Sequence, residues 1–95
     1  MPTEILTPQR ILTRNPSIFA SKVDDDLVMM NEKQGSYFGL NSVARKIWEL
    51  LATPLSYDML LHRLVDTYKI DIERCSIEVK PFFLQMIEHR LIHIE

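Results

Sequence analysis

The hydrophobic pattern of this 95-residue chain changes its period at Asn41, and this change limits the folds open to it. Before Asn41 the apolar residues stand in short runs separated by acidic or glycine-containing turns, which is typical of β-strands. After Asn41 they recur every three or four residues, as they do on amphipathic helices. Strands followed by helices predict an α+β fold, here a three-stranded antiparallel sheet followed by three helices.

Three apolar runs before Asn41 predict the strands of an antiparallel meander: Ile18–Val23, Leu27–Asn31 and Ser36–Leu40. The turns between them are Asp24–Asp26 and Glu32–Gly35, and Gly35 can take a left-handed conformation. In a meander the third strand lies at an edge, where its outer backbone groups have no partner strand. Residues 1–17 contain three of the five prolines and predict an extended arm that is loosely tied or disordered.

Three helices are predicted after Asn41: Ser42–Leu51, a segment that begins after Ser56, and Ile72 to about Arg90. Asn41, Ser56 and Asp71 stand at the N-cap positions of these helices. Pro81 lies inside the third helix, where it removes a backbone hydrogen bond and is expected to produce a kink near residues 77–80.

The third predicted helix is apolar over about twice the width that one packed face needs. One stripe is predicted to belong to the core: Ile77, Pro81, Leu84, Ile87 and Leu91. The second stripe lies on the other side of Lys80: Ile72, Cys75, Val79, Phe82, Phe83 and Met86. Two interpretations of the second stripe stay open. Either it is also buried, or it lines a groove for a partner, with Phe82, Phe83 and Met86 partly exposed in the free protein.

Gly39, inside the third predicted strand, also allows two interpretations. Glycine is found in strands where another backbone approaches closely, and it can also ease the bend from the strand to the helix that follows Asn41. Together, an edge strand and an apolar helix face predict a cleft that binds an extended peptide by strand addition.

Charge and composition disfavour several classes of protein. Eleven Lys and Arg against thirteen Asp and Glu give a formal charge of −2, without the basic patch of a nucleic-acid-binding protein. The single cysteine, Cys75, cannot form an internal disulfide. The sequence shows neither a signal peptide nor an apolar run long enough to cross a bilayer, so we expect a cytoplasmic protein with no membrane partner.

We expect no catalytic residue, no metal site and no cofactor. His89 and His93 are four residues apart, but a zinc site needs three or four ligands. Cys75 has no catalytic signature around it and occupies an apolar helix position, where cysteine behaves as a small hydrophobic residue. Only two glycines occur, which leaves no glycine-rich phosphate loop, so the chain is not expected to be an enzyme.

The run Gly35-Ser36-Tyr37-Phe38-Gly39-Leu40-Asn41 resembles a motif of the peptide-recognition family named after the D protein of pyrroloquinoline-quinone biosynthesis. Further matching residues follow this run: Ala44, Ile47, Trp48, Glu49, Leu50 and Leu51. The resemblance covers roughly residues 12–92. It implies a winged helix-turn-helix-like domain that binds the leader segment of a ribosomally made precursor peptide and delivers it to a modifying enzyme.

In this family the leader adds as a strand beside the third strand and packs against the third helix. The resemblance therefore implies a leader-binding site made of Ser36, Tyr37, Phe38, Gly39, Leu40, Val79, Phe82, Phe83 and Met86. The Tyr-Phe-Gly-Leu-Asn form is most similar to the free-standing recognition proteins of lasso-peptide pathways. There the partners are a cysteine protease that removes the leader and a cyclase that closes the ring.

On this interpretation residues 1–11 are a flexible arm and residues 12–95 are the peptide-recognition domain. One alternative is a carrier chaperone for a radical or other peptide-modifying enzyme, and a purely structural subunit is another. A winged-helix DNA-binding regulator would contain the same elements. It is disfavoured because residues 72–90 carry three basic and three acidic side chains and so lack an electrostatic footprint for DNA.

Overall fold

The strands expected before Asn41 form an antiparallel meander in the computed structural model, which describes residues 6–24, 26–31 and 35–95. The strands are β2 (Ile18–Val23), β3 (Asp26–Asn31) and β4 (Ser36–Leu40), in the order β2-β3-β4. The prediction that the third strand lies at an edge is confirmed. Gly35 has a φ of 65°, the left-handed conformation expected of it, whereas Asp25 and residues 32–34 of the predicted turns lie outside the described residues.

The meander has an inner face toward the helices and an outer face away from them, because side chains alternate along a strand. On the inner face Met29 is fully buried, and Phe38 packs against the hydrophobic core. On the outer face Tyr37 and Phe19 are 70% and 55% exposed. The cross-strand register aligns Phe19 with Met30 and Met30 with Tyr37, so these three side chains form one row across the outer face.

A second sheet joins segments that are far apart in the sequence. Strand β1 (Ile11–Arg14) lies between β5 (Leu55–Ser56) and β6 (Ile92–Ile94), in the order β5-β1-β6, and pairs antiparallel with both. The Arg14 guanidinium donates two hydrogen bonds, of 2.9 and 2.6 Å, to the carbonyl of Trp48 near the end of the first helix. It also lies 4.4 Å above the Trp48 ring. Burial lowers the pKa of Arg14, against the opposing effect of Glu49.

This sheet shows that the prediction of a loosely tied arm over residues 1–17 is wrong for residues 11–14. The strand is only four residues long, and its partner strands lie about 40 and 80 positions further along the chain. No local sequence pattern therefore predicts it. Leu12 is fully buried and Leu6 is 3% exposed. Residues 1–5 lie outside the described residues, and the division into an arm (1–11) and a domain (12–95) stays a prediction.

The helices begin where the sequence predicts them. They are α1 (Ser42–Leu50), α2 (Tyr57–Tyr68) and α3 (Ile72–Glu88). The predicted N-caps are confirmed, because the side chains of Asn41, Ser56 and Asp71 accept hydrogen bonds from backbone N–H groups of the first turns. Helix α3 continues through Pro81.

Helix α3 ends two residues earlier than predicted, with His89 as its C-cap. Arg90 follows with a φ of 59°, which turns the chain into β6. His89 and His93 therefore do not share a helix face, since His93 belongs to the strand.

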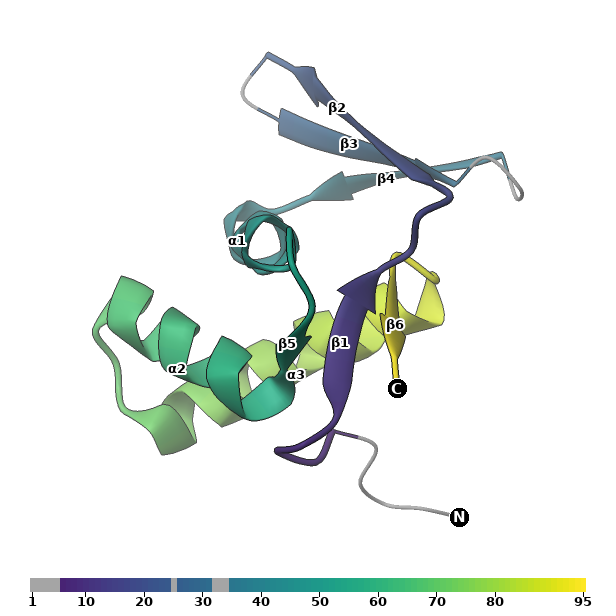
Figure 1. Ribbon diagram of the computed structural model, residues 1–95. Helices are drawn as coiled ribbons and strands as arrows, with labels where there is room; N and C mark the ends of the chain where they lie inside the picture. The colour runs from purple at the N-terminus through teal and green to yellow at the C-terminus, as the bar shows by residue number, and fades with distance from the viewer. Residues whose placement is uncertain (1–5, 25, 32–34) are drawn as a thin grey trace.

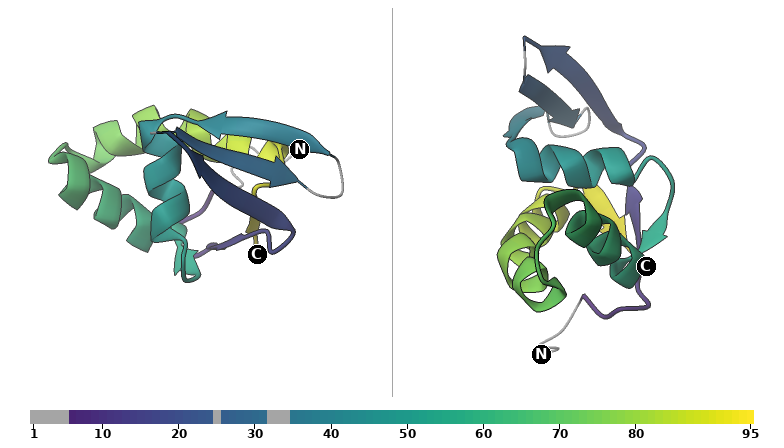
Figure 2. Two further views of the ribbon diagram at one scale, coloured as in Figure 1. Left: turned by 90° about the horizontal axis from the view of Figure 1, so that it is seen from above. Right: turned by 90° about the vertical axis from the view of Figure 1, so that its left-hand side faces the viewer.

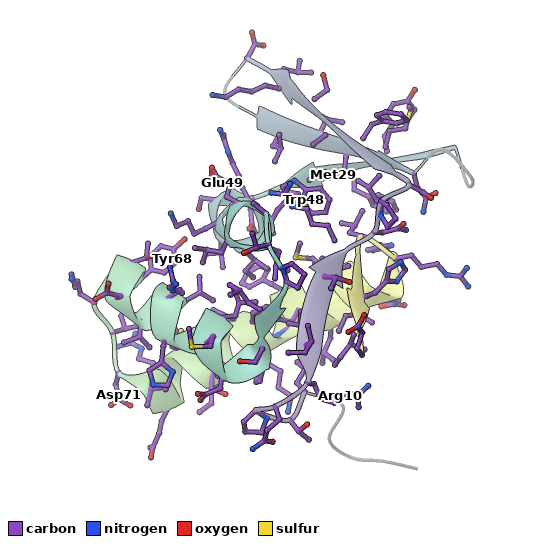
Figure 3. The ribbon with its side chains drawn as sticks, in the orientation of Figure 1. Arg10, Met29, Trp48, Glu49, Tyr68 and Asp71 are labelled. Carbon is purple, nitrogen blue, oxygen red and sulfur yellow. The ribbon has the colours of Figure 1, made fainter. Side chains whose placement is uncertain are left out.

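The elements are arranged in layers. Figure 1 shows the meander above α1, with α2 and α3 below α1 and the small sheet beside them, and the right view of Figure 2 shows the same order. The side chains of Met29 and Trp48 lie between the meander and α1 (Figure 3), where Trp48 is 5% exposed. The result is an α+β, winged helix-turn-helix-like fold, in which α3 contacts the other two helices and its C-terminal half lies near β4.

Candidate functional site

The stripe of α3 predicted to be core is largely exposed, and the second stripe, for which burial is one of the two interpretations, is largely buried. Cys75, Val79, Phe83 and Met86 are buried, whereas Ile77 is 74% exposed and Leu84 is 38% exposed. The prediction that Ile77, Leu84 and Ile87 are core is therefore wrong for the first two, and Ile87 is half-buried. Both stripes satisfy the helical period, so the period alone could not show which one faces α1 and α2.

Of the two interpretations of the second stripe, partial exposure is confirmed at Phe82, whereas burial is confirmed at Phe83 and Met86. Phe82 is half-buried, but Phe83 is fully buried and Met86 is 3% exposed. The Phe83 ring packs edge-on against Tyr57 of α2, with 5.3 Å between ring centroids. Phe83 is thus a core residue, and the surface of α3 that remains available near β4 is formed around Phe82.

A pocket of about 280 Å³ lies between the open edge of β4 and the C-terminal half of α3. Its lining is formed by Tyr37, Phe38, Gly39, Leu40, Asn41, Ala44, Phe82, Gln85, Met86, His89 and Leu91. Seen from above, β4 runs along this part of α3 (Figure 2, left). The structure therefore brings six predicted site residues together: Tyr37, Phe38, Gly39, Leu40, Phe82 and Met86. We call this pocket the groove.

Three predicted site residues remain. Ser36 is the first residue of β4. Phe83 lies in the core. Val79 lines a second, mainly apolar pocket of about 460 Å³, together with Val43, Tyr68, Ile70, Glu78 and Phe82. Because Phe82 borders both pockets, the apolar surface continues from the groove past the end of β4.

Two polar side chains of the groove, Gln85 and His89, are absent from the predicted site. The His89 ring lies against the Phe38 ring, with 4.3 Å between centroids and a 40° angle between planes. Both residues lie three or four positions from Phe82 or Met86, so helical spacing from these residues could have identified them.

Burial favours the neutral forms of two groups outside the groove, Tyr68 and Cys75. Burial, followed by the charges of Glu49 and Cys75, raises the pKa of the Tyr68 hydroxyl in the second pocket. Burial and then Glu78 raise the pKa of the Cys75 thiol, which disfavours the nucleophilic thiolate. Among the described residues, no three His, Cys, Asp or Glu side chains are grouped so as to hold a metal ion. No helix in residues 6–24, 26–31 and 35–95 has the length and apolar character needed to cross a membrane.

Comparison with known proteins gives one family and two similar structures. The profile of the family described as coenzyme PQQ synthesis protein D (PqqD) matches residues 26–92. A search of curated proteins gives no match. The solved structure of TbiB1 in complex with the TbiA(beta) leader peptide is 21% identical, with a TM-score of 0.74, and the match covers 85% of this chain and 94% of that one.

The second similar structure is lasso peptide synthetase B1 complexed with the leader peptide. It is 17% identical, with a TM-score of 0.66, and the match covers 86% of this chain and 96% of that one. At these identities the two structures establish a shared fold and no more.

Proposed function

This chain belongs to the PqqD family, and we propose that it binds the leader segment of a ribosomally made precursor peptide, of the lasso-peptide type, without catalysing a reaction itself. The observation that carries the proposal is the groove between an open strand edge and an apolar helix face. Two proteins with this fold are known in complexes with leader peptides, which supports the same class of ligand here.

The open edge of β4 supplies the main-chain part of binding. A leader segment in extended conformation pairs its N–H and C=O groups with those of Ser36–Leu40 and becomes the fourth strand of the meander. Its other edge then faces α3, where the amide of Gln85 and the imidazole of His89 offer hydrogen-bonding groups. Strand β2 forms the other edge of the meander, but its residues from Phe19 to Val23 are exposed and are not part of the groove.

The side chains of the groove supply selectivity. Alternate leader side chains point inward, where Phe38, Phe82 and Met86 offer an apolar surface. The second pocket, which includes Val79, takes a further apolar side chain beyond the end of β4. Phe83 contributes indirectly, because its packing against Tyr57 holds α3 against α2.

The bound leader is then presented to the enzymes that mature the precursor. For a lasso-peptide precursor these are a leader-processing cysteine protease and the cyclase that closes the ring, and we place this step in the cytoplasm. Binding by strand addition suits this role, since it holds the leader in extended form and leaves the rest of the precursor free.

The test begins with a search beside the gene for this chain for a short precursor gene, whose leader is then made synthetically. We expect a labelled synthetic leader to bind in a fluorescence anisotropy titration, and a scrambled leader of the same composition not to bind. Hydrogen exchange should slow at those backbone amides of Ser36–Leu40 that point to the open edge when the leader binds, because these amides gain a partner strand.

Strand β2 provides the matched control, since it is the opposite edge of the same sheet. Its amides at Ile18–Val23 should exchange at the same rate with and without the leader. Protection of β2 in place of β4, or a leader that binds without changing either edge, contradicts strand addition at β4.

A further inference from the structure

The outer face of the meander has an open space next to its most exposed aromatic side chain. Tyr37 and Gly39 border the groove at the edge of β4, but they alternate with the inward-facing Phe38 and so face outward, and Tyr37 is 70% exposed. A Cβ atom placed on Gly39 would meet no other atom within 4 Å. Val28 lies directly across from Gly39 on β3, and Met30 lies across from Tyr37. The open space therefore has Tyr37 and apolar β3 residues around it.

Nothing in the free chain requires glycine at position 39. Its φ lies outside the left-handed region that favours glycine, in contrast to Gly35, which has a φ of 65°. Its missing side chain also makes room for no other part of the protein. A β-branched residue would suit a strand better than glycine does, so the space is available to a group from outside the chain.

A strand that pairs with β4 brings side chains to this space. If the leader lies beside β4, every second leader side chain points away from the groove and onto the outer face. Cross-strand neighbours on one face are about 5 Å apart at Cβ, and diagonal neighbours are within reach of aromatic side chains. A leader residue opposite Gly39 therefore lies over the open space and beside the Tyr37 ring.

We propose that Tyr37 and Gly39 form an outer-face subsite that takes one large apolar or aromatic side chain of the leader. This inference rests on the proposed leader binding and adds a selectivity that the groove cannot supply. The leader residue packs its ring or alkyl chain across Gly39 and against Tyr37, next to the row formed by Phe19, Met30 and Tyr37. The substrate class is thus a leader with large apolar side chains on both faces of its paired segment.

The occupant is the leader because the row ends at the edge where the leader pairs. Phe19 belongs to the same row and is 55% exposed, but it lies two strands away from that edge. A partner that covered the whole outer face would depend on Phe19 as much as on Tyr37. A leader side chain depends only on Tyr37 and Gly39, which makes Phe19 the matched control.

The test measures the affinity of the fluorescein-labelled synthetic leader, and of variants with single alanines in its paired segment, by anisotropy. The proteins are the native chain and the variants Gly39→Val, Tyr37→Ser and Phe19→Ser. We expect Gly39→Val and Tyr37→Ser to weaken binding of the native leader about three- to tenfold, the range of aromatic packing contacts, and Phe19→Ser to leave it unchanged. All three positions are exposed, so the thermal midpoints should stay close to that of the native chain.

The leader variants identify the side chain that occupies the subsite. For one leader residue with a large side chain, the leader variant with alanine at that position should bind to Gly39→Val and to the native protein with the same affinity. If Gly39→Val weakens all leader variants equally, it crowds the leader backbone and the subsite is contradicted, although strand addition stands. Unchanged affinity in Gly39→Val also overturns the subsite, as does an equal loss in Phe19→Ser and Tyr37→Ser. Absence of any leader binding to the native chain overturns both the subsite and the proposed function.

Discussion

One face of α3 carries Cys75, Val79 and Phe83, whose side chains are at most 4% exposed, whereas the other face carries Ile77 and Leu84, which are 74% and 38% exposed. Both faces are apolar, and both follow the helical period. The first face packs against α1 and α2, and its margin at Phe82 borders the groove. The second face includes Pro81 and lies away from the core.

The difference shows that residue type alone does not assign a side chain of this helix to core or surface. Removing apolar surface from water lowers the free energy of the folded state. A buried phenylalanine therefore stabilises the fold, whereas an exposed isoleucine contributes little. The groove lies at the boundary between the two environments, where Phe82 is half-buried. Each of the following experiments tests one part of this comparison.

The largest effect is expected for a change on the buried face. Phe83→Ala should lower the free energy of unfolding by about 3–5 kcal/mol, since Phe83 is fully buried and its loss leaves a cavity. Its neighbour Leu84, on the exposed face, is the matched control, and Leu84→Ala should cost less than about 1 kcal/mol. Urea unfolding followed by circular dichroism measures both. Equal losses for the two variants would show that the exposed face is also packed.

The next largest effect is expected at Pro81, where a substitution should raise the free energy of unfolding. Proline has no N–H to donate to the carbonyl of Ile77, one turn earlier, and costs about 3 kcal/mol in a helix interior. Pro81→Ala restores that donor at an exposed position, so we expect stability to rise by about 1–3 kcal/mol. The urea midpoint should increase without loss of leader affinity. A lower midpoint would mean that the neighbouring turns of α3 depend on proline at this position.

A smaller effect, on binding instead of folding, is expected at the margin of the buried face. Phe82→Ala should weaken the leader complex about 5- to 30-fold, as expected for the loss of an apolar anchor of about 1–2 kcal/mol. Ile77→Ala, on the exposed face, is the control and should leave the affinity unchanged. Isothermal titration with the synthetic leader measures both dissociation constants. If Ile77→Ala weakens binding and Phe82→Ala does not, the leader contacts the other face of α3.

The last prediction is that neither face of α3 binds DNA with sequence specificity. In a DNA-binding winged helix the recognition helix carries a basic surface, whereas residues 72–90 carry three basic and three acidic side chains. An anisotropy titration with duplex DNA at physiological salt should give a Kd no tighter than about 10⁻⁶ M, the range of non-specific binding. A sequence-specific Kd below about 10⁻⁷ M would make this helix a DNA reader and reject the assignment of a peptide-binding class.

The sequence by itself determined those features that depend on neighbours a few positions away. Strand alternation and turn residues located β2, β3 and β4, and the side chains of Asn41, Ser56 and Asp71 located the starts of the helices. Since a meander pairs consecutive strands, the order of these strands also identified β4 as an edge. Most of the groove residues on β4 could be predicted for this reason.

Only the tertiary structure decided the features that depend on contacts between distant residues. Strand β1 exists because β5 and β6 pair with it, and four residues alone carry too weak a pattern to reveal it. Phe83 is buried and Ile77 is exposed because α1 and α2 cover one side of α3, although the periodicity of α3 allows either side. Local backbone and capping preferences act within a turn or two, whereas burial depends on which surfaces the whole chain brings together.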